Sequence, residues 1–251
     1  MPNLKQYNVV MKNIIIYVIA ILFSITQYSQ SKEECFANLS IFAEYAKVKN
    51  YKAAYQPWVD LKNQCPDLNS AIYVLGERML KSFIKTSDDS LKAQYQKDLV
   101  VLYDEWLQYF PKTKRGVSEV GKILAIKAQA LSDYKLADDT EKLKIYDEAF
   151  SRDPKSFKSP KGLYNYFKLY FKLYKAGDPS VTLEKVFDKY EELTEKFEYE
   201  MGVYTSKLDE VEKNEEKSEP LPSTKIRNKK VYGVNMVPCN PYLNNLNAII
   251  A

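Results

Sequence analysis

The stretch CFANLSIFAEYAKVKNYKAAYQPWVDLKNQCPDL, residues 35–68, decides how this chain folds. Its apolar side chains recur at helical spacing on both sides of a short polar break at residues 47–50. They are Leu39, Ile41, Phe42 and Tyr45 before the break and Tyr51, Ala54, Tyr55, Trp58 and Leu61 after it. This periodicity predicts two amphipathic helices joined by a tight turn, which together form an antiparallel hairpin.

Two residues of the second predicted helix are suited to close packing, and a third opposes it. Ala54 is small where the helices would cross, and Trp58 supplies a large apolar side chain to fill the space beside it. Pro57 has no backbone N–H, so we expect the second helix either to begin late or to kink at this residue.

This hairpin resembles one unit of the tetratricopeptide repeat (TPR) family, whose repeat is 34 residues long. With Cys35 as repeat position 1, five residues fall where that family places an aromatic, a small residue, an aromatic, a small or apolar residue and a terminating proline. They are Tyr51, Ala54, Trp58, Leu61 and Pro66. Phe42 and Lys49 depart from the family, which prefers small residues there. The resemblance implies an all-α fold of stacked antiparallel hairpins, a TPR-like α-solenoid, whose surface binds other proteins.

Two further segments repeat this arrangement and end, like the first, on an aromatic residue and a proline. Residues 69–111 pair one apolar stripe (Ile72, Leu75, Met79, Phe83) with another (Leu99, Leu102, Tyr103, Trp106, Leu107, Phe110). Residues 115–154 repeat the pattern, with Asp138 and its neighbours Asp139 and Thr140 as the N-cap of the second helix. Both segments are therefore predicted to be hairpins.

The chain then continues into an aromatic helix and a much longer one. From Gly162, a stripe of Tyr164, Phe167, Phe171 and Tyr174 predicts a buried helix face, with a sugar-binding row as the alternative. After the turn at Gly177, apolar positions from Val186 to Val211 predict a single helix that reaches Glu216. That helix either forms a coiled-coil-like arm or is covered by the residues C-terminal to it.

These patterns predict four regions. Residues 1–30 read as a signal peptide, 31–212 as a TPR-like repeat domain, 213–230 as a charged linker, and 231–251 as the start of a further helical unit. The last region stops after three turns of helix, which indicates a truncated member of a longer repeat protein.

The first 30 residues predict export. Lys5 and Lys12 precede an apolar run at 14–25, and a small or polar exit comes after it, which is the order of a secretory signal peptide. We expect cleavage near Ser29 or Gln30, with an uncleaved membrane anchor as the alternative. The protein would then lie in the periplasm or at the outer membrane, as do the exported repeat proteins of double-membraned bacteria that it resembles.

Export favours disulfides, because oxidising compartments preserve them. An antiparallel hairpin brings Cys35 and Cys65 to the same end, so we predict a disulfide between them. Two buried free thiols are the alternative. Cys239 is left without a partner in this chain.

The composition argues against several functions. The chain has no histidine, which removes the commonest general base and the commonest transition-metal ligand. We therefore expect no enzyme activity, no cofactor and no metal site. A net charge of +4 gives no electrostatic case for nucleic acid. Residues 116–122 match most of a phosphate-binding loop, but Ile123 replaces the hydroxyl residue that would hold magnesium, so an ordinary helix start is expected.

The resemblance to TPR proteins also indicates which residues would face a partner. The inward positions of the first unit include Phe36, Leu39, Ala43 and Lys47. Only Lys47 carries charge, so the family's Lys and Asn clamp for a terminal carboxylate is absent. A groove lined by the other three would suit an apolar helix or the next unit of the stack. The expected partner is a protein of the cell envelope, and a glycan or another ligand held by aromatic helix faces is the alternative.

Overall fold

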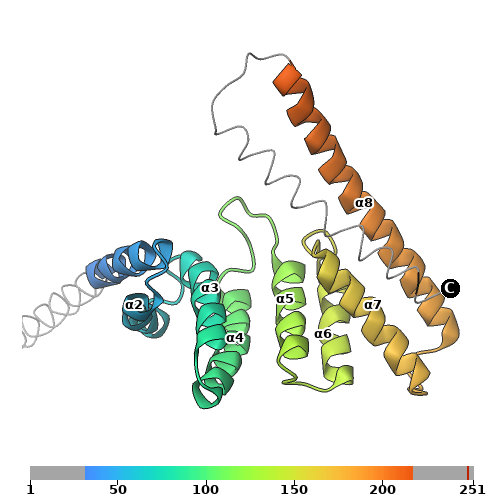
Figure 1. Ribbon diagram of the computed structural model, residues 1–251, viewed down its shortest axis with the longest axis horizontal. Coiled ribbons are helices and arrows are strands. Elements are labelled where there is room, and N and C mark those ends of the chain that lie inside the picture. Colours follow the sequence, from blue (N-terminus) through green and yellow to red (C-terminus); the bar gives the residue numbers. More distant parts are fainter. Residues whose placement is uncertain (1–31, 217–247, 249–251) are drawn as a thin grey trace, which may run out of the picture. The chain divides into compact units, whose positions relative to one another are not determined.

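The computed structural model describes residues 32–216 and residue 248 (Figure 1). Within this part of the chain the regular structure is helical, apart from one isolated antiparallel bridge between Lys112 and Ser118. The first helix covers residues 32–47, and seven more come after it: α2 (Tyr51–Gln64), α3 (Ala71–Thr86), α4 (Asp89–Tyr109), α5 (Val120–Asp133), α6 (Asp139–Arg152), α7 (Pro160–Lys175) and α8 (Leu183–Glu216). The all-α class is confirmed, and consecutive helices pack against each other, namely α2 on α3, α5 on α6, α6 on α7 and α7 on α8.

The chain divides into two compact units inside α4, the first ending at Asp98 and the second beginning at Leu99. Each unit is described by itself. The predicted signal peptide, most of the predicted linker and Cys239 lie outside the described residues.

In the first unit, the helix of residues 32–47 and α2 are joined where the sequence predicts a turn. Lys49 adopts a left-handed backbone conformation with φ of 60°, and the Asn50 side chain accepts a hydrogen bond from the backbone N–H of Ala53. The expectation that Pro57 would delay α2 is wrong. The helix begins at Tyr51 and continues through Pro57 to Gln64, with Trp58 and Leu61 buried beyond the proline.

The first unit's core forms where α2 packs on α3. The Trp58 indole N–H donates a hydrogen bond of 2.9 Å to the backbone carbonyl of Ile72, and Gly76 leaves room for the ring. The buried face of α3 comprises Ile72, Tyr73, Gly76, Met79, Leu80 and Ile84. Leu75 and Phe83, which the sequence pattern placed in the core, are only half-buried. Phe83 instead packs at the core's edge against the rings of Tyr55 and Tyr95.

In the second unit, α5 and α6 form the closest helix pair. Gly121 and Ala149 are small at their crossing, and a side chain on Gly121 would overlap the backbone carbonyl of Asp153 at the end of α6. The predicted N-cap of α6 is confirmed, because the Asp138 side chain accepts a 2.8 Å hydrogen bond from the Glu141 backbone N–H.

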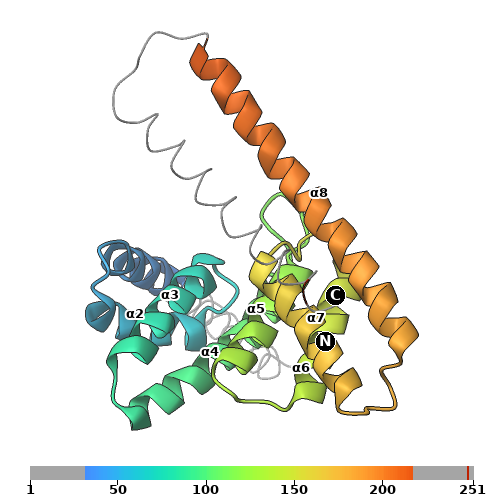
Figure 2. The same cartoon turned by 45° about the vertical axis from the view of Figure 1, so that its right-hand side comes forward.

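The remaining helices, α7 and α8, lie side by side (Figure 2). The aromatic face of α7 is largely core, with Tyr166, Phe167 and Tyr170 buried, whereas the expected stripe residues Tyr164, Phe171 and Tyr174 are half-buried. The predicted long helix is confirmed: α8 spans 34 residues and includes the first four of the expected linker. Val186, Leu193 and Phe197, all in its first half, lie in the core.

Candidate interaction surfaces

The residues predicted to face a partner lie on one side of the first helix. Phe36 is 50% exposed, Leu39 and Ala43 are half-buried, and Lys47 is exposed and pairs with Glu44 at 2.7 Å. The adjoining side of the helix packs into the unit through Cys35, Phe42 and Ala46. The structure thus brings the four predicted residues onto one face that is partly open to solvent.

A second exposed apolar strip, formed by the same helix and the residue after it, was not predicted as surface. Ile41, Tyr45 and Val48 are all exposed, although the sequence pattern placed Ile41 and Tyr45 with the core residue Phe42. Their spacing of four and three residues puts them on one face, and this face differs from that of Phe42. A helical projection from residue 42 would have separated the two faces.

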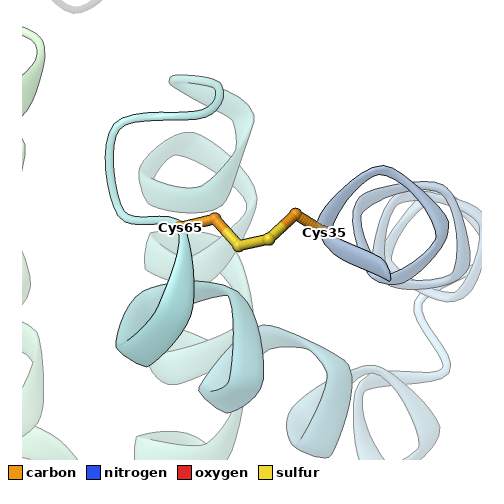
Figure 3. Close-up of a disulfide and its surroundings, with 2 residues drawn as sticks. All are labelled: Cys35 and Cys65. Carbon is orange, nitrogen blue, oxygen red and sulfur yellow. A yellow bond between two sulfur atoms is a disulfide. The ribbon is translucent and has the colours of Figure 1, made fainter. Parts of the chain in front are cut away.

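The predicted disulfide ties the start of the first helix to the end of α2 (Figure 3). Cys35 and Cys65 are joined through their sulfur atoms, with their Cα atoms 6.3 Å apart and both residues buried. The hairpin geometry therefore places the two cysteines as the sequence predicted, and the bond closes the open end of the hairpin.

The segment that resembles a phosphate-binding loop is an ordinary turn before a helix. Gly116 takes a left-handed φ of 78° between Thr113 and Val117, and α5 starts at Val120. The carboxylate of Asp153 already occupies the N-terminus of α5 and accepts a hydrogen bond from the Gly121 backbone N–H at 3.4 Å. A side chain of the protein thus takes the place that a phosphate would need.

The environment of Asp153 favours its charged form. Burial by itself would raise the pKa of this carboxyl, but hydrogen bonds from Ser156, Ser118 and the Gly121 backbone outweigh burial and lower the pKa below its usual value. Ser156 also accepts a 3.0 Å hydrogen bond from the backbone N–H of Lys122. Asp153 and Ser156 together cap α5 from the end of α6.

The adjacent acids Asp138 and Asp139 both have partners in the fold. Asp138 caps α6, and Asp139 pairs with Lys142 at 2.6 Å and with Lys172 at 2.5 Å. Hydrogen bonds from these two lysines lower the pKa of Asp139. Within residues 32–216, no cluster of acidic or cysteine side chains is arranged to hold a metal ion.

A partly exposed polar cluster connects α6, α7 and α8. The Tyr166 hydroxyl donates a hydrogen bond to the Asp147 carboxylate, and the Lys189 ammonium lies 5.1 Å from the Tyr166 ring centre and 5.3 Å from that of Phe150. Lys189 also pairs with Glu192 at 2.5 Å. Each charged group in this cluster has a partner within it, so the cluster links α8 to α6 and α7.

Comparison with protein families and with curated proteins adds no relative. No known protein family matches the sequence, and no characterised protein matches it either. In the part of the chain that the structure describes, no helix combines the length and apolar character needed to cross a bilayer.

Proposed function

We propose that this protein is a non-enzymatic TPR scaffold outside the cytoplasm that holds other proteins together in the bacterial cell envelope. The observation that carries the proposal is the partly open face of the first helix, where Phe36, Leu39 and Ala43 present apolar surface on a hairpin braced by a disulfide. An apolar helix of a partner fits such a face, because it buries its own apolar stripe there.

The repeated hairpin plan supports this proposal. Stacked hairpins bury their helices against neighbouring hairpins and leave an extended surface for partners. The resemblance of residues 35–68 to a TPR unit supports a binding role in the same way, and the predicted signal peptide supports export. No cofactor is needed for such a role.

A glycan-binding function is the second candidate, and one cluster favours it. The first unit carries a half-buried aromatic group made of Tyr51, Tyr55, Phe83 and Tyr95. The pKa of the Tyr55 hydroxyl is raised, mainly by burial and also by the nearby charge of Asp98. Aromatic faces bordered by polar groups can also hold sugar rings.

Cross-linking and affinity capture from the envelope fraction of cells that express the protein test the scaffold function. We expect specific protein partners with the wild type and their loss with Phe36→Asp, because a carboxylate there would have to be desolvated against the partner's apolar face. Leu91→Asp is the matched control, since Leu91 is 49% exposed in the same unit and lies outside the proposed face.

The outcomes separate the two candidates. Capture of the same partners by wild type, Leu91→Asp and Phe36→Asp would show that this face does not bind them. Recovery of no protein partner, together with saturable sugar binding that is lost on Tyr55→Ala, would favour the glycan-binding function instead.

A further inference from the structure

A cleft of about 370 Å³ opens in the second unit between the loop before α5 and the segment after α6. Thr113 and Val117 line one wall, Lys155 and Lys158 line the other, and Lys122 projects from the first turn of α5. Val117 is 62% exposed, so apolar surface adjoins the lysines.

The acidic groups of the cleft already have partners in the protein. Glu119 pairs with Lys122 at 2.5 Å, and Asp153 is held by the hydrogen bonds that cap α5. The ammonium groups of Lys155 and Lys158, in contrast, make no hydrogen bond or ion pair within residues 32–216. Within this part of the chain, two positive charges are therefore available to a ligand.

The surrounding segments strengthen this positive potential. Residues 112–122 and 153–158 contain six basic residues and two acidic ones, an excess equal to the net charge of +4 of the whole chain. The loop that carries Thr113 and Val117 also contributes Lys112, Lys114 and Arg115. A local excess of one sign of charge attracts ligands of the opposite sign.

We propose that this cleft binds an acidic segment of a partner protein, with Asp or Glu carboxylates at Lys155 and Lys158 and an apolar side chain against Val117. This inference rests on the proposed scaffold function and names the chemistry of one partner. The helix N-terminus is not part of the site, because Asp153 occupies it.

The geometry favours a peptide over other polyanions. The cleft combines two free ammonium groups with an exposed valine, which suits a segment that mixes carboxylates with apolar side chains. A nucleic acid would be expected to use aromatic side chains for base stacking, and none lines this cleft. Membrane phosphates and free phosphate would use the lysines but leave Val117 without a partner.

The test measures binding of a labelled peptide to the full chain by fluorescence anisotropy. The peptide alternates Glu or Asp with Leu over about 12 residues, which in extended form is long enough to span the cleft. We expect saturable binding that weakens as salt rises and weakens roughly fivefold to tenfold in the double variant Lys155→Gln/Lys158→Gln, because two charge pairs are lost. A peptide with Lys in place of each acid should not bind. Val117→Ser should also weaken binding without altering its dependence on salt.

The matched control is Lys144→Gln/Lys168→Gln, which removes the same charge from exposed positions on α6 and α7 outside the cleft. Equal binding by both double variants, or equal binding of the basic peptide, would overturn the proposal. So would lysine-dependent binding of inorganic phosphate, single-stranded DNA or phosphatidylglycerol vesicles without binding of the acidic peptide. Envelope partners that are still captured by Lys155→Gln/Lys158→Gln would leave the scaffold function intact while removing this cleft from it.

Discussion

The indole of Trp58 lies directly over the backbone of Gly76. A Cβ atom added to Gly76 would stand 2.5 Å from the indole nitrogen and 3.0 Å from the adjacent ring carbon. The ring cannot readily move aside, because its N–H is hydrogen-bonded to the Ile72 carbonyl and its surface is buried. The packing of α2 on α3 therefore depends on the absence of a side chain at residue 76.

Gly76→Ala should destabilise the first unit by about 1–3 kcal/mol, the usual range for overpacking, even though alanine is the better helix former. The chain's two tryptophans lie in different units. In a Trp106→Phe background, the fluorescence change during urea unfolding therefore comes from Trp58 alone. Gly202→Ala is the control, because nothing lies within 4 Å of a Cβ at that helical position. A neutral or stabilising effect of Gly76→Ala would contradict the packing described.

Reduction of the disulfide should weaken the first unit and spare the second. The bond spans 30 residues, and a loop of that length corresponds to about 3–4 kcal/mol of unfolded-state entropy. Urea unfolding with and without dithiothreitol should show this loss through Trp58 fluorescence, with Trp106 little affected. Mass spectrometry after alkylation of the unreduced protein should find one free thiol, that of Cys239. Three alkylated cysteines would contradict the disulfide.

Asp153→Asn should lower the stability of the second unit at neutral pH and reduce its sensitivity to acid. The pKa of Asp153 is lower in the folded state than in the unfolded state. Its charged form therefore contributes stability above the unfolded pKa of about 3.9, and this contribution is lost as the pH falls through the lower pKa of the folded state. We expect a loss of about 1–2 kcal/mol at pH 7, because the amide nitrogen of asparagine cannot accept the hydrogen bonds from Gly121 and Ser156 that one carboxylate oxygen of Asp153 accepts. Urea unfolding through Trp106 between pH 2 and pH 7 measures both effects.

Glu198→Gln controls for the change of charge in the Asp153 experiment, because Glu198 is exposed on α8. Its stability profile should match that of the wild type. Parallel acid profiles for wild type and Asp153→Asn, with equal stability at pH 7, would show that Asp153 does not cap α5.

Tyr166→Phe should destabilise the second unit by about 1–2 kcal/mol, because the Asp147 carboxylate loses its hydroxyl donor in a partly buried position. The pKa of Tyr166 is raised, first by burial and then by the hydrogen bond and charge of Asp147. Its protonated form therefore stabilises the fold below the unfolded pKa of about 10, and this stabilisation is lost as the pH rises above that value. Unfolding curves at pH 7 and pH 11 measure both effects. Tyr199→Phe, at a ring 64% exposed, should change neither.

The pattern of apolar residues predicted the helices well because each helix must bury one face. The turn at residues 47–50, the N-cap at Asp138 and the long helix that reaches Glu216 depend on local propensity, which acts within a few residues. Pro57 was the exception. There, packing of Trp58 and Leu61 against the rest of the unit outweighs the local cost of a proline inside a helix.

The candidate surfaces were only partly predictable. Phe36, Leu39, Ala43 and Lys47 could be assigned to one face because their spacing fixes it. The cleft between Val117 and Lys155 could not, because its two walls are 38 residues apart in sequence and meet only when α6 returns alongside α5.

By itself, the sequence determined the helical class, the positions of the hairpins and the pairing of Cys35 with Cys65, because these depend on spacing along the chain. Only the tertiary structure decided which face of α3 is buried, that Asp153 takes the N-terminus of α5, and that Lys155 and Lys158 lie beside it without a partner among residues 32–216. Those outcomes depend on which helices approach one another and how closely. For the first hairpin at residues 35–68, the deciding contact is Trp58 against a glycine in the next helix of the chain.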